Sequence, residues 1–268
     1  METISILGCG WLGLPLAHNF IHNGYKVKGS TTSPGKINSL KGNRIDPFIV
    51  TLTPLLNSGT NKFFNADVLI INIPPNNGDD KVEYHKKQIE SIKTTLDKSS
   101  TSRVIFVSST SVYNECNSTV VEEDAVNPES ISGKALLAAE NILFRSRKFK
   151  TTIIRFGGLI GEDRNPGKFL AGRINVTGGN TPVNIIHRDD CIEIIFQVIK
   201  QDVYGEVFNA VADEHPTKKE FYTKAALSLN LEPPQFNNEK TNYKIVVSSK
   251  LKQKLGYKFI HPDPMKIV

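Results

Sequence analysis

Residues 4–13, ISILGCGWLG, decide the fold of this chain. An apolar, β-branched segment runs directly into three glycines spaced as G-x-G-x-x-G. In that pattern the first glycine permits the tight turn out of a strand, the second lets the backbone approach a pyrophosphate, and the third lets the next helix pack closely. The context, a strand before and an amphipathic helix after, predicts a dinucleotide-binding turn. The residues expected to hold the pyrophosphate are Gly8, Gly10, Trp11, Leu12 and Gly13.

Short apolar segments alternate with helical segments along much of the chain. Residues 68–71 read VLII, which is typical of a strand covered on both faces in a parallel sheet. Repeated strand–helix units with right-handed crossovers give a Rossmann-type, doubly wound α/β sheet. We expect strands at 3–7, 26–30, 45–51, 68–72, 103–108, 151–156 and 206–210, helices at 11–23, 33–40, 81–98, 134–149, 189–201, 217–229 and 250–255, and an extended segment at 243–247.

The pattern loosens after residue 157, where loops rich in Gly, Pro and Asn separate short helices. We therefore expect an NAD(P)-binding Rossmann domain at 1–157, with its sheet completed by segments within 183–212. Residues 158–268 would form a mixed region that includes a small α+β substrate lobe. Since open α/β sheets bind ligands at the carboxyl ends of their strands, such a lobe would close a substrate cleft.

The end of the second strand indicates which dinucleotide binds. An NAD-specific site usually places Asp or Glu there, to bind the ribose 2′-hydroxyl. Residues 30–36 read STTSPGK and contain no acid. Hydroxyls and a lysine suit a 2′-phosphate, which favours NADP(H) over NAD(H); alternatively, the hydroxyls only cap the next helix. The residues expected here are Ser30, Thr31, Thr32 and Lys36.

A Pro-rich segment after the fourth strand is a further candidate. Residues 72–75 read NIPP, and the backbone of Ile73 and Pro74 would line the cofactor at the mouth of the cleft. The alternative is that these prolines only end the strand.

The composition of the chain limits the classes of molecule that it is expected to bind. The chain has 268 residues, a formal net charge of +6 and three widely separated cysteines. The basic balance suits an anionic or polar small molecule, and no Lys/Arg run resembles a nucleic-acid patch. Nothing resembles a signal peptide or a membrane span, and the cysteine pattern favours a reducing compartment. We therefore expect a cytoplasmic protein with neither nucleic-acid nor membrane partners.

One histidine pair has a ligand-like spacing. His18 and His22 are four residues apart on a predicted helix, but Asn19 stands where a zinc-binding H-E-x-x-H helix has its Glu. No third ligand is evident nearby. The sequence therefore predicts no metal site.

Several segments together resemble one enzyme family. A strand at 104–107 ends in hydroxyls, and the chain is similar over nearly its whole length to the extended branch of the short-chain dehydrogenase/reductase (SDR) family. More narrowly it resembles the YeeZ-like atypical group, described loosely as NAD(P)-dependent epimerases. The segments that carry the resemblance are GWLGLPLA at 10–17, SSTSVY at 108–113, SGK at 132–134, RFGGLIG at 155–161, HRDD at 187–190, LGY at 255–257 and HPDP at 261–264.

The resemblance implies a catalytic arrangement that this chain only partly keeps. In the family, the hydroxyls after the strand lie beside the nicotinamide, which falls on Ser108, and the second hydroxyl bonds the reacting oxygen, which falls on Ser109. The family's general acid/base is a Tyr whose pKa is lowered by a Lys four residues on. Ser132 and Leu136 stand at these two positions.

Two nearby side chains are candidate substitutes for the missing pair. Lys134 lies two residues from the family's lysine position, and Tyr113 is the nearest phenol in sequence. Each also has a plainer interpretation. Lys134 would be a solvated residue of the first helical turn, Tyr113 a packing residue after the strand, and Ser109 a backbone-capping hydroxyl.

The resemblance favours an NADP-dependent oxidoreductase or epimerase that transfers hydride to or from a polar, sugar-nucleotide-like substrate. The missing Tyr/Lys pair favours a second hypothesis, a non-catalytic NADP(H)-binding sensor or regulatory protein. A β-hydroxyacid or UDP-sugar dehydrogenase is disfavoured, because the tail is too short and mixed for the all-helical second domain of those enzymes. Family members often dimerise through the helices expected here at 81–98 and 134–149, which implies a homodimer.

Overall fold

A computed structural model describes residues 1–75 and 80–268 of the chain. Its main sheet is built from β1 (Thr3–Leu7), β2 (Lys26–Thr31), β3 (Asp46–Ile49), β4 (Val68–Ile71), β5 (Arg103–Ser109), β7 (Lys150–Phe156) and β10 (Val207–Ala210). The strand order is β10-β7-β5-β4-β1-β2-β3, and β1 pairs in parallel with both β2 and β4. The predicted Rossmann-type α/β fold is confirmed.

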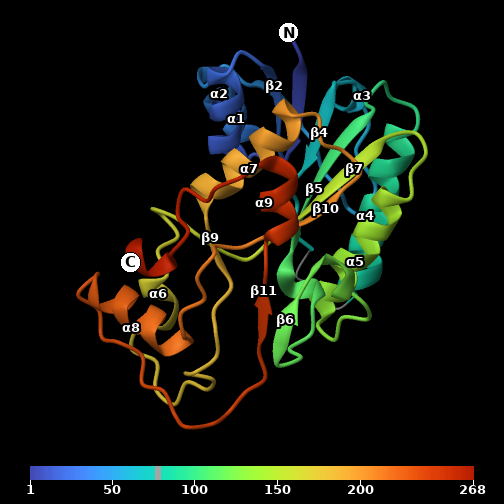
Figure 1. Ribbon diagram of the computed structural model, residues 1–268. Helices are drawn as coiled ribbons and strands as arrows, with labels where there is room; N and C mark the ends of the chain where they lie inside the picture. Colours follow the sequence, from blue (N-terminus) through green and yellow to red (C-terminus); the bar gives the residue numbers. More distant parts are fainter. Residues whose placement is uncertain (76–79) are drawn as a thin grey trace. The chain divides into compact units, whose positions relative to one another are not determined.

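Helices cover both faces of the central strands, which explains the apolar sequence of those strands. In Figure 1, α1 and α2 lie on one side of β1, β2 and β4, and α4 and α5 lie on the other. Every residue of β4 is fully buried. The helices of this part are α1 (Gly13–His22), α2 (Ile37–Gly42), α3 (Asn61–Phe64), α4 (Lys81–Leu96) and α5 (Ile131–Phe144).

Helix α5 differs most from its prediction, because it begins at Ile131 and ends at Phe144, not at 134 and 149. Ser130 sets the start, since its Oγ accepts a hydrogen bond of 3.0 Å from the Gly133 amide. A Cβ on Gly133 would lie 2.2 Å from the Ser111 carbonyl oxygen, so the first turn packs directly on the segment that follows β5. The expected helix at 33–40 is instead a 3₁₀ turn, Pro34–Lys36, followed by α2.

The chain forms two compact units. The first contains Met1–Val112, Asn127–Ile154 and Ile195–Val207, and the second contains Tyr113–Val126, Arg155–Ile194 and Phe208–Val268. The chain therefore passes from one unit to the other several times, once between Ile154 and Arg155. The division predicted at residue 157 stays a prediction.

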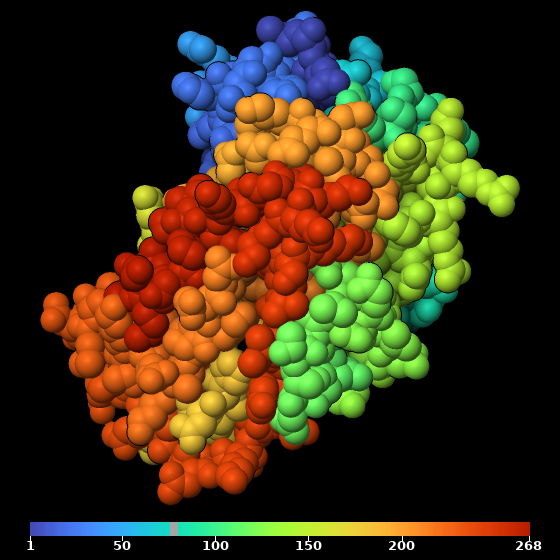
Figure 2. All heavy atoms as spheres, in the orientation of Figure 1, coloured from blue at the N-terminus to red at the C-terminus, as the bar shows by residue number. Residues whose placement is uncertain are grey.

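The second unit is a mixture of short strands and helices. Strand β6 (Ser118–Val120) pairs in parallel with β11 (Lys244–Val246), and the red C-terminal segment borders the green β6 segment on the surface in Figure 2. Strand β8 (Gly158–Ile160) pairs in parallel with β9 (Ile185–His187). Ile160, Val183, Ile185 and Phe221 form a core cluster. The remaining helices are α6 (Gly167–Leu170), α8 (Lys218–Leu227), α9 (Ser249–Leu255) and α7 (Arg188–Lys200), of which α7 belongs to this unit only as far as Ile194.

Short 3₁₀ turns, η2 (Thr110–Val112), η3 (Glu122–Asp124) and η4 (Pro264–Lys266), complete the secondary structure described above. Across residues 1–75 and 80–268, no helix has the length and apolar character needed to cross a bilayer.

Candidate functional site

The three glycines of the first turn have different roles. Gly8 has φ +105°, and its amide donates a 2.8 Å hydrogen bond to the Ser30 hydroxyl. A Cβ on Gly8 would lie 2.4 Å from the Asn72 carbonyl oxygen, and one on Gly13 would lie 2.2 Å from the Gly8 carbonyl oxygen. A Cβ on Gly10 would meet nothing within 4 Å. Gly8 and Gly13 therefore allow the backbone to pack, whereas Gly10 borders open space that a phosphate can enter.

The start of α1 is suited to an anion. The helix begins at Gly13, and Leu12 before it provides no side-chain cap. The first turn contains no acidic residue. Amides at such a helix end are available to a phosphate, and the helix dipole favours its charge. Leu12 is buried and Trp11 half-buried, so they support the turn and do not line the neighbouring cleft.

A cleft of about 270 Å³ adjoins the glycine turn in the first unit. It brings together eight of the residues expected to bind cofactor: Gly8, Gly10, Ser30, Thr31, Thr32, Lys36, Ile73 and Pro74. Its other lining residues are Leu7, Cys9, Val50, Leu52 and Gln88, which were not predicted from the sequence. None of these lining residues is acidic, so the part of the cleft formed by residues 1–75 and 80–268 has no carboxylate to repel a phosphate.

Some polar side chains of the cleft are hydrogen-bonded to the protein backbone, and others are exposed and available to a ligand. The buried Ser30 hydroxyl accepts the Gly8 amide, and Thr31 Oγ1 accepts the Ser33 amide at 3.1 Å. Thr32 and Lys36 are exposed. Ser33, which precedes the 3₁₀ turn, makes no side-chain capping bond. Thr32 and Lys36 are therefore the groups best placed to meet an anion, while Ser30 and Thr31 shape the turn.

The serine cluster lies at the carboxyl end of β5. Ser108 Oγ donates a 2.5 Å hydrogen bond to Glu140 of α5, and both residues are buried. Ser109 is half-buried, and its Oγ accepts a 3.2 Å bond from the Ser111 amide. The Ser108 hydroxyl thus ties the strand to α5. The Ser109 hydroxyl keeps its proton available, because in this contact it acts as the acceptor. No sequence pattern around Glu140 indicated that it would contact this serine.

The residues at the family's Tyr and Lys positions lie on α5. Ser132 is exposed, whereas Leu136 is only 5% exposed and packs in the interior. Lys134 is exposed in the first turn of α5, the turn that Gly133 packs against the segment after Ser109. The cationic side chain in this turn is therefore the exposed Lys134, and Leu136 cannot replace the family's lysine.

Tyr113 belongs to a buried network in the second unit. Its hydroxyl donates to Asn209 Oδ1 at 2.6 Å and accepts from Arg155 Nη1 at 2.8 Å. Arg155 also donates to the Glu122 carbonyl oxygen at 2.7 Å. Burial raises the pKa of Tyr113 to about 12, although the nearby Arg155 opposes that shift. A phenol so placed is a poor proton donor or acceptor near neutral pH, so the geometry favours a structural role.

Solved structures share this fold. The UDP-glucuronic acid 4-epimerase from Bacillus cereus, solved in complex with NAD, superposes with a TM-score of 0.78 at 19% identity, over 98% of this chain and 95% of that one. The UDP-N-acetylglucosamine 4-epimerase from Bacillus cereus gives a TM-score of 0.76 at 15% identity, over 100% and 99% of the two chains. At such identities the likeness shows a common Rossmann-type fold.

A relative in sequence narrows the classification. No model of a known protein family matches the sequence. The protein YeeZ from Escherichia coli strain K12 is 32% identical over 270 aligned positions, which cover 99% of this chain and 98% of that protein. The chain belongs to the group of YeeZ-like proteins.

Proposed function

We propose that this protein is an NADP-dependent oxidoreductase or epimerase acting on a polar sugar nucleotide. The observation that carries the proposal is the acid-free cleft beside the glycine turn, with Thr32 and Lys36 exposed at its edge. A cationic ammonium group and a hydroxyl together match a ribose 2′-phosphate. At about 270 Å³, the cleft suits the adenosine-ribose half of a dinucleotide.

The residues present fit the cofactor. The open space at Gly10 and the uncapped start of α1 suit the pyrophosphate. When bound, the nicotinamide would donate or accept the hydride. The buried Ser108–Glu140 pair holds the end of β5 rigid, so that Ser109 presents its hydroxyl in a fixed position.

Ser109 is the proposed catalytic residue for orienting the reacting oxygen, and Lys134 is the proposed proton donor or acceptor. The Ser109 hydroxyl donates a hydrogen bond to that oxygen, while its own lone pair accepts one from the Ser111 amide. The long side chain of Lys134 starts from an exposed turn beside this segment and is free to reorient. Tyr113 keeps the structural role described above.

The substrate class follows from similarity and charge. Similar solved structures are epimerases named for UDP-glucuronic acid and UDP-N-acetylglucosamine. The net charge of +6 favours an anionic substrate of that kind. We extend this class, polar nucleotide-linked sugars, to the present chain.

Titration calorimetry with NADPH and NADH tests the cofactor preference. Lys36→Ala should weaken NADPH binding roughly tenfold and leave NADH binding almost unchanged, because only the 2′-phosphate loses a charge-assisted bond. Lys41→Ala is the matched control, since Lys41 is also exposed on the same segment but does not line the cleft. An equal loss of affinity for both cofactors in Lys36→Ala would contradict the NADP preference, as would a wild-type protein that binds NADH more tightly than NADPH.

A second candidate function is a non-catalytic NADP(H) sensor. The observation that favours it is Leu136, buried where the family has its lysine, together with the locked phenol of Tyr113. Hydride transfer measured with UDP-glucuronic acid and UDP-N-acetylglucosamine separates the two candidates. Turnover that Ser109→Ala abolishes supports the enzyme. Tight NADPH binding without turnover supports the sensor.

We further propose a homodimer and a cytoplasmic location. The dimer proposal is supported by the packing of α4 against α5 and by Ile131 and Phe144, which are 57% and 43% exposed on α5. The three cysteines are all free, as expected for a reducing compartment.

A further inference from the structure

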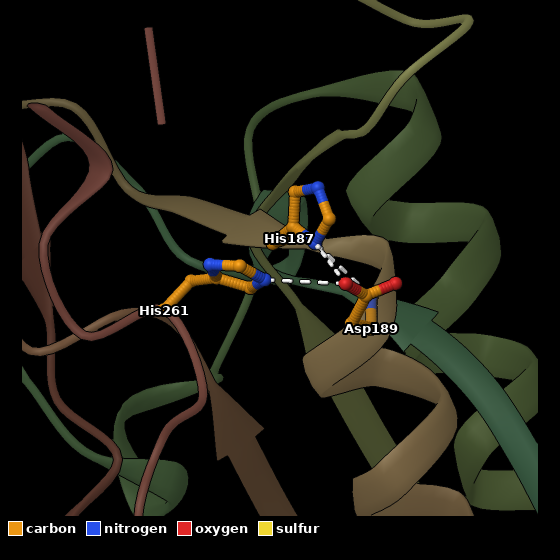
Figure 3. A group of neighbouring side chains, drawn as sticks. All are labelled: His187, Asp189 and His261. Carbon is orange, nitrogen blue, oxygen red and sulfur yellow. Dashed lines mark hydrogen bonds and ion pairs between the residues drawn. The ribbon is translucent and has the colours of Figure 1, made fainter. Parts of the chain in front are cut away.

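Two histidines and an aspartate meet in the second unit, outside the site described above. His187 ends β9, Asp189 lies in the first turn of α7, and His261 lies in the segment after α9, as Figure 3 shows. Asp189 Oδ2 is 3.2 Å from His187 Nδ1 and 3.2 Å from His261 Nε2. One atom from each residue lies within 4.8 Å of the other two, and the two rings are 4.2 Å apart between centroids.

The two separations from Asp189 Oδ2 match those between the ligands of a tetrahedral metal ion. Zinc binds histidine nitrogen and carboxylate oxygen at about 2.0–2.2 Å, so neighbouring ligand atoms of a tetrahedral site stand about 3.3–3.5 Å apart. The two 3.2 Å distances to Asp189 are close to that value. Asp189 Oδ2 therefore stands at ligand spacing from each histidine nitrogen, and the third pair, His187 Nδ1 and His261 Nε2, lies within 4.8 Å.

Hydrogen bonding alone does not satisfy the group. His187 Nδ1 lies 3.3 Å from the Asp189 amide, which donates to it, and 3.2 Å from the Asp189 carboxylate oxygen. If Nδ1 carries a lone pair, it accepts the amide but faces another acceptor; if it carries a proton, it bonds the carboxylate but faces another donor. A cation shared by Nδ1 and Oδ2 would take the Nδ1 lone pair in place of the long amide contact, and it would remove the repulsion between the two acceptors.

A neighbouring carboxylate fixes the third ligand in place. Asp190 is fully buried, and it accepts hydrogen bonds from the Tyr257 hydroxyl and the Ile260 amide at 2.7 Å and from the His261 amide at 3.0 Å. Asp190 thus ties the segment that carries His261 to the first turn of α7. Groups that position ligands in this way raise metal affinity, because less ordering is needed on binding.

The local charges also permit a cation. Arg188 lies between two of the ligands in sequence, but its guanidinium lies 3.1 Å from Asp163 and 3.7 Å from Glu162, whose charges offset its own. The His187 side chain is 11% exposed, so water has little access to this ligand.

We propose that His187 Nδ1, Asp189 Oδ2 and His261 Nε2 bind Zn²⁺ or a chemically similar divalent transition metal, with the fourth position left to water. Two imidazoles and one carboxylate form a donor set that suits zinc and its neighbours over Mg²⁺ or Ca²⁺. Such an ion would fasten the segment around residues 257–261 to the start of α7. This site is separate in its residues from the proposed cofactor cleft.

Metal binding to the full chain tests this site. Protein freed of metal with a chelator is titrated with ZnCl₂ by calorimetry and with CoCl₂ by visible absorption, which reports tetrahedral geometry. We expect one ion per chain. His261→Gln and Asp189→Asn should each weaken Zn²⁺ binding by at least tenfold, because each removes a ligand.

The matched control is the double variant His18→Gln/His22→Gln. These two exposed histidines are four residues apart on α1 and form the other histidine pair with ligand-like spacing. The control should bind Zn²⁺ with unchanged affinity. Absence of binding, wild-type affinity in both ligand variants, or loss of binding in the control variant would each overturn the proposal. Asp189 is half exposed, so Asp189→Asn decides the matter if circular dichroism shows that His261→Gln does not fold.

Discussion

Alanine at Gly13 should destabilise the protein and alanine at Gly10 should not, although the two glycines are only three residues apart. At Gly13 the new Cβ would lie 2.2 Å from the Gly8 carbonyl oxygen, and it must move to at least 3.0 Å. Overpacking of this kind costs about 1–3 kcal/mol. For a chain of this size that lowers Tm by about 2–12 °C.

At Gly10 the new Cβ meets nothing within 4 Å. Substitutions that disturb no contact usually change stability by less than about 0.5 kcal/mol, so Gly10→Ala should unfold at nearly the wild-type temperature. The methyl group would nevertheless occupy the space into which a pyrophosphate enters. We therefore expect NADPH affinity to fall at least tenfold, which corresponds to about 1.4 kcal/mol.

Thermal unfolding and calorimetric titration with NADPH, run on both variants and the wild type, measure the two effects separately. Gly10→Ala should bind NADPH more weakly and keep the wild-type Tm, whereas Gly13→Ala should have a lower Tm. A Gly10→Ala protein that melts as early as Gly13→Ala would refute the described packing of the turn. A Gly10→Ala protein that binds NADPH with wild-type affinity would show that no phosphate approaches at Gly10.

Three further outcomes are expected. Tyr113→Phe removes a buried hydroxyl bonded to Asn209 and Arg155, so it should lower the free energy of unfolding by about 1–3 kcal/mol while NADPH affinity, measured by calorimetry, stays unchanged. Burial lowers the pKa of His85 below its ordinary 6.5, so the unfolded chain binds this proton at a higher pH than the folded chain does. The free energy of unfolding should therefore fall as the pH drops below 6.5, and it should fall less in His85→Gln. Denaturant unfolding at pH 7 and pH 5 measures both changes. Phe144→Glu should convert the proposed dimer into a monomer in light scattering, and an unchanged dimer mass would contradict the use of α5 as interface.

Segments with strong local signals were predicted well from the sequence. Strand β1 begins and ends where expected, because an apolar run is cut off sharply by Gly8. Helix α5 was misplaced, because its start depends on Ser130, a cap that was overlooked within a run of polar residues. Its end at Phe144 leaves residues 145–149 outside the helix.

The candidate site was predicted only where it follows strand ends. Ser30 and Lys36 could be predicted to lie in one cleft because they stand at the end of a recognisable strand and just after it. Gln88 lines the same cleft from a helix distant in the sequence, and nothing local marks it. Tyr113 was proposed as a catalytic phenol from its position beside the serines. Its actual partners lie 42 and 96 residues further along the chain, where sequence patterns carry no information about pairing.

The pairing of β6 with β11 has a consequence for synthesis on the ribosome. Ser118 pairs with Lys244, so β6 is made 126 residues before its partner. At the usual elongation rates of about 5–20 residues per second, β6 is synthesised roughly 6–25 s before that partner. Over that interval a strand edge of the nascent second unit is open to wrong partners. Chaperone demand during translation should therefore fall on the second unit, and the β1–β2 region, whose paired residues are separated by 23 positions, should be structured long before release.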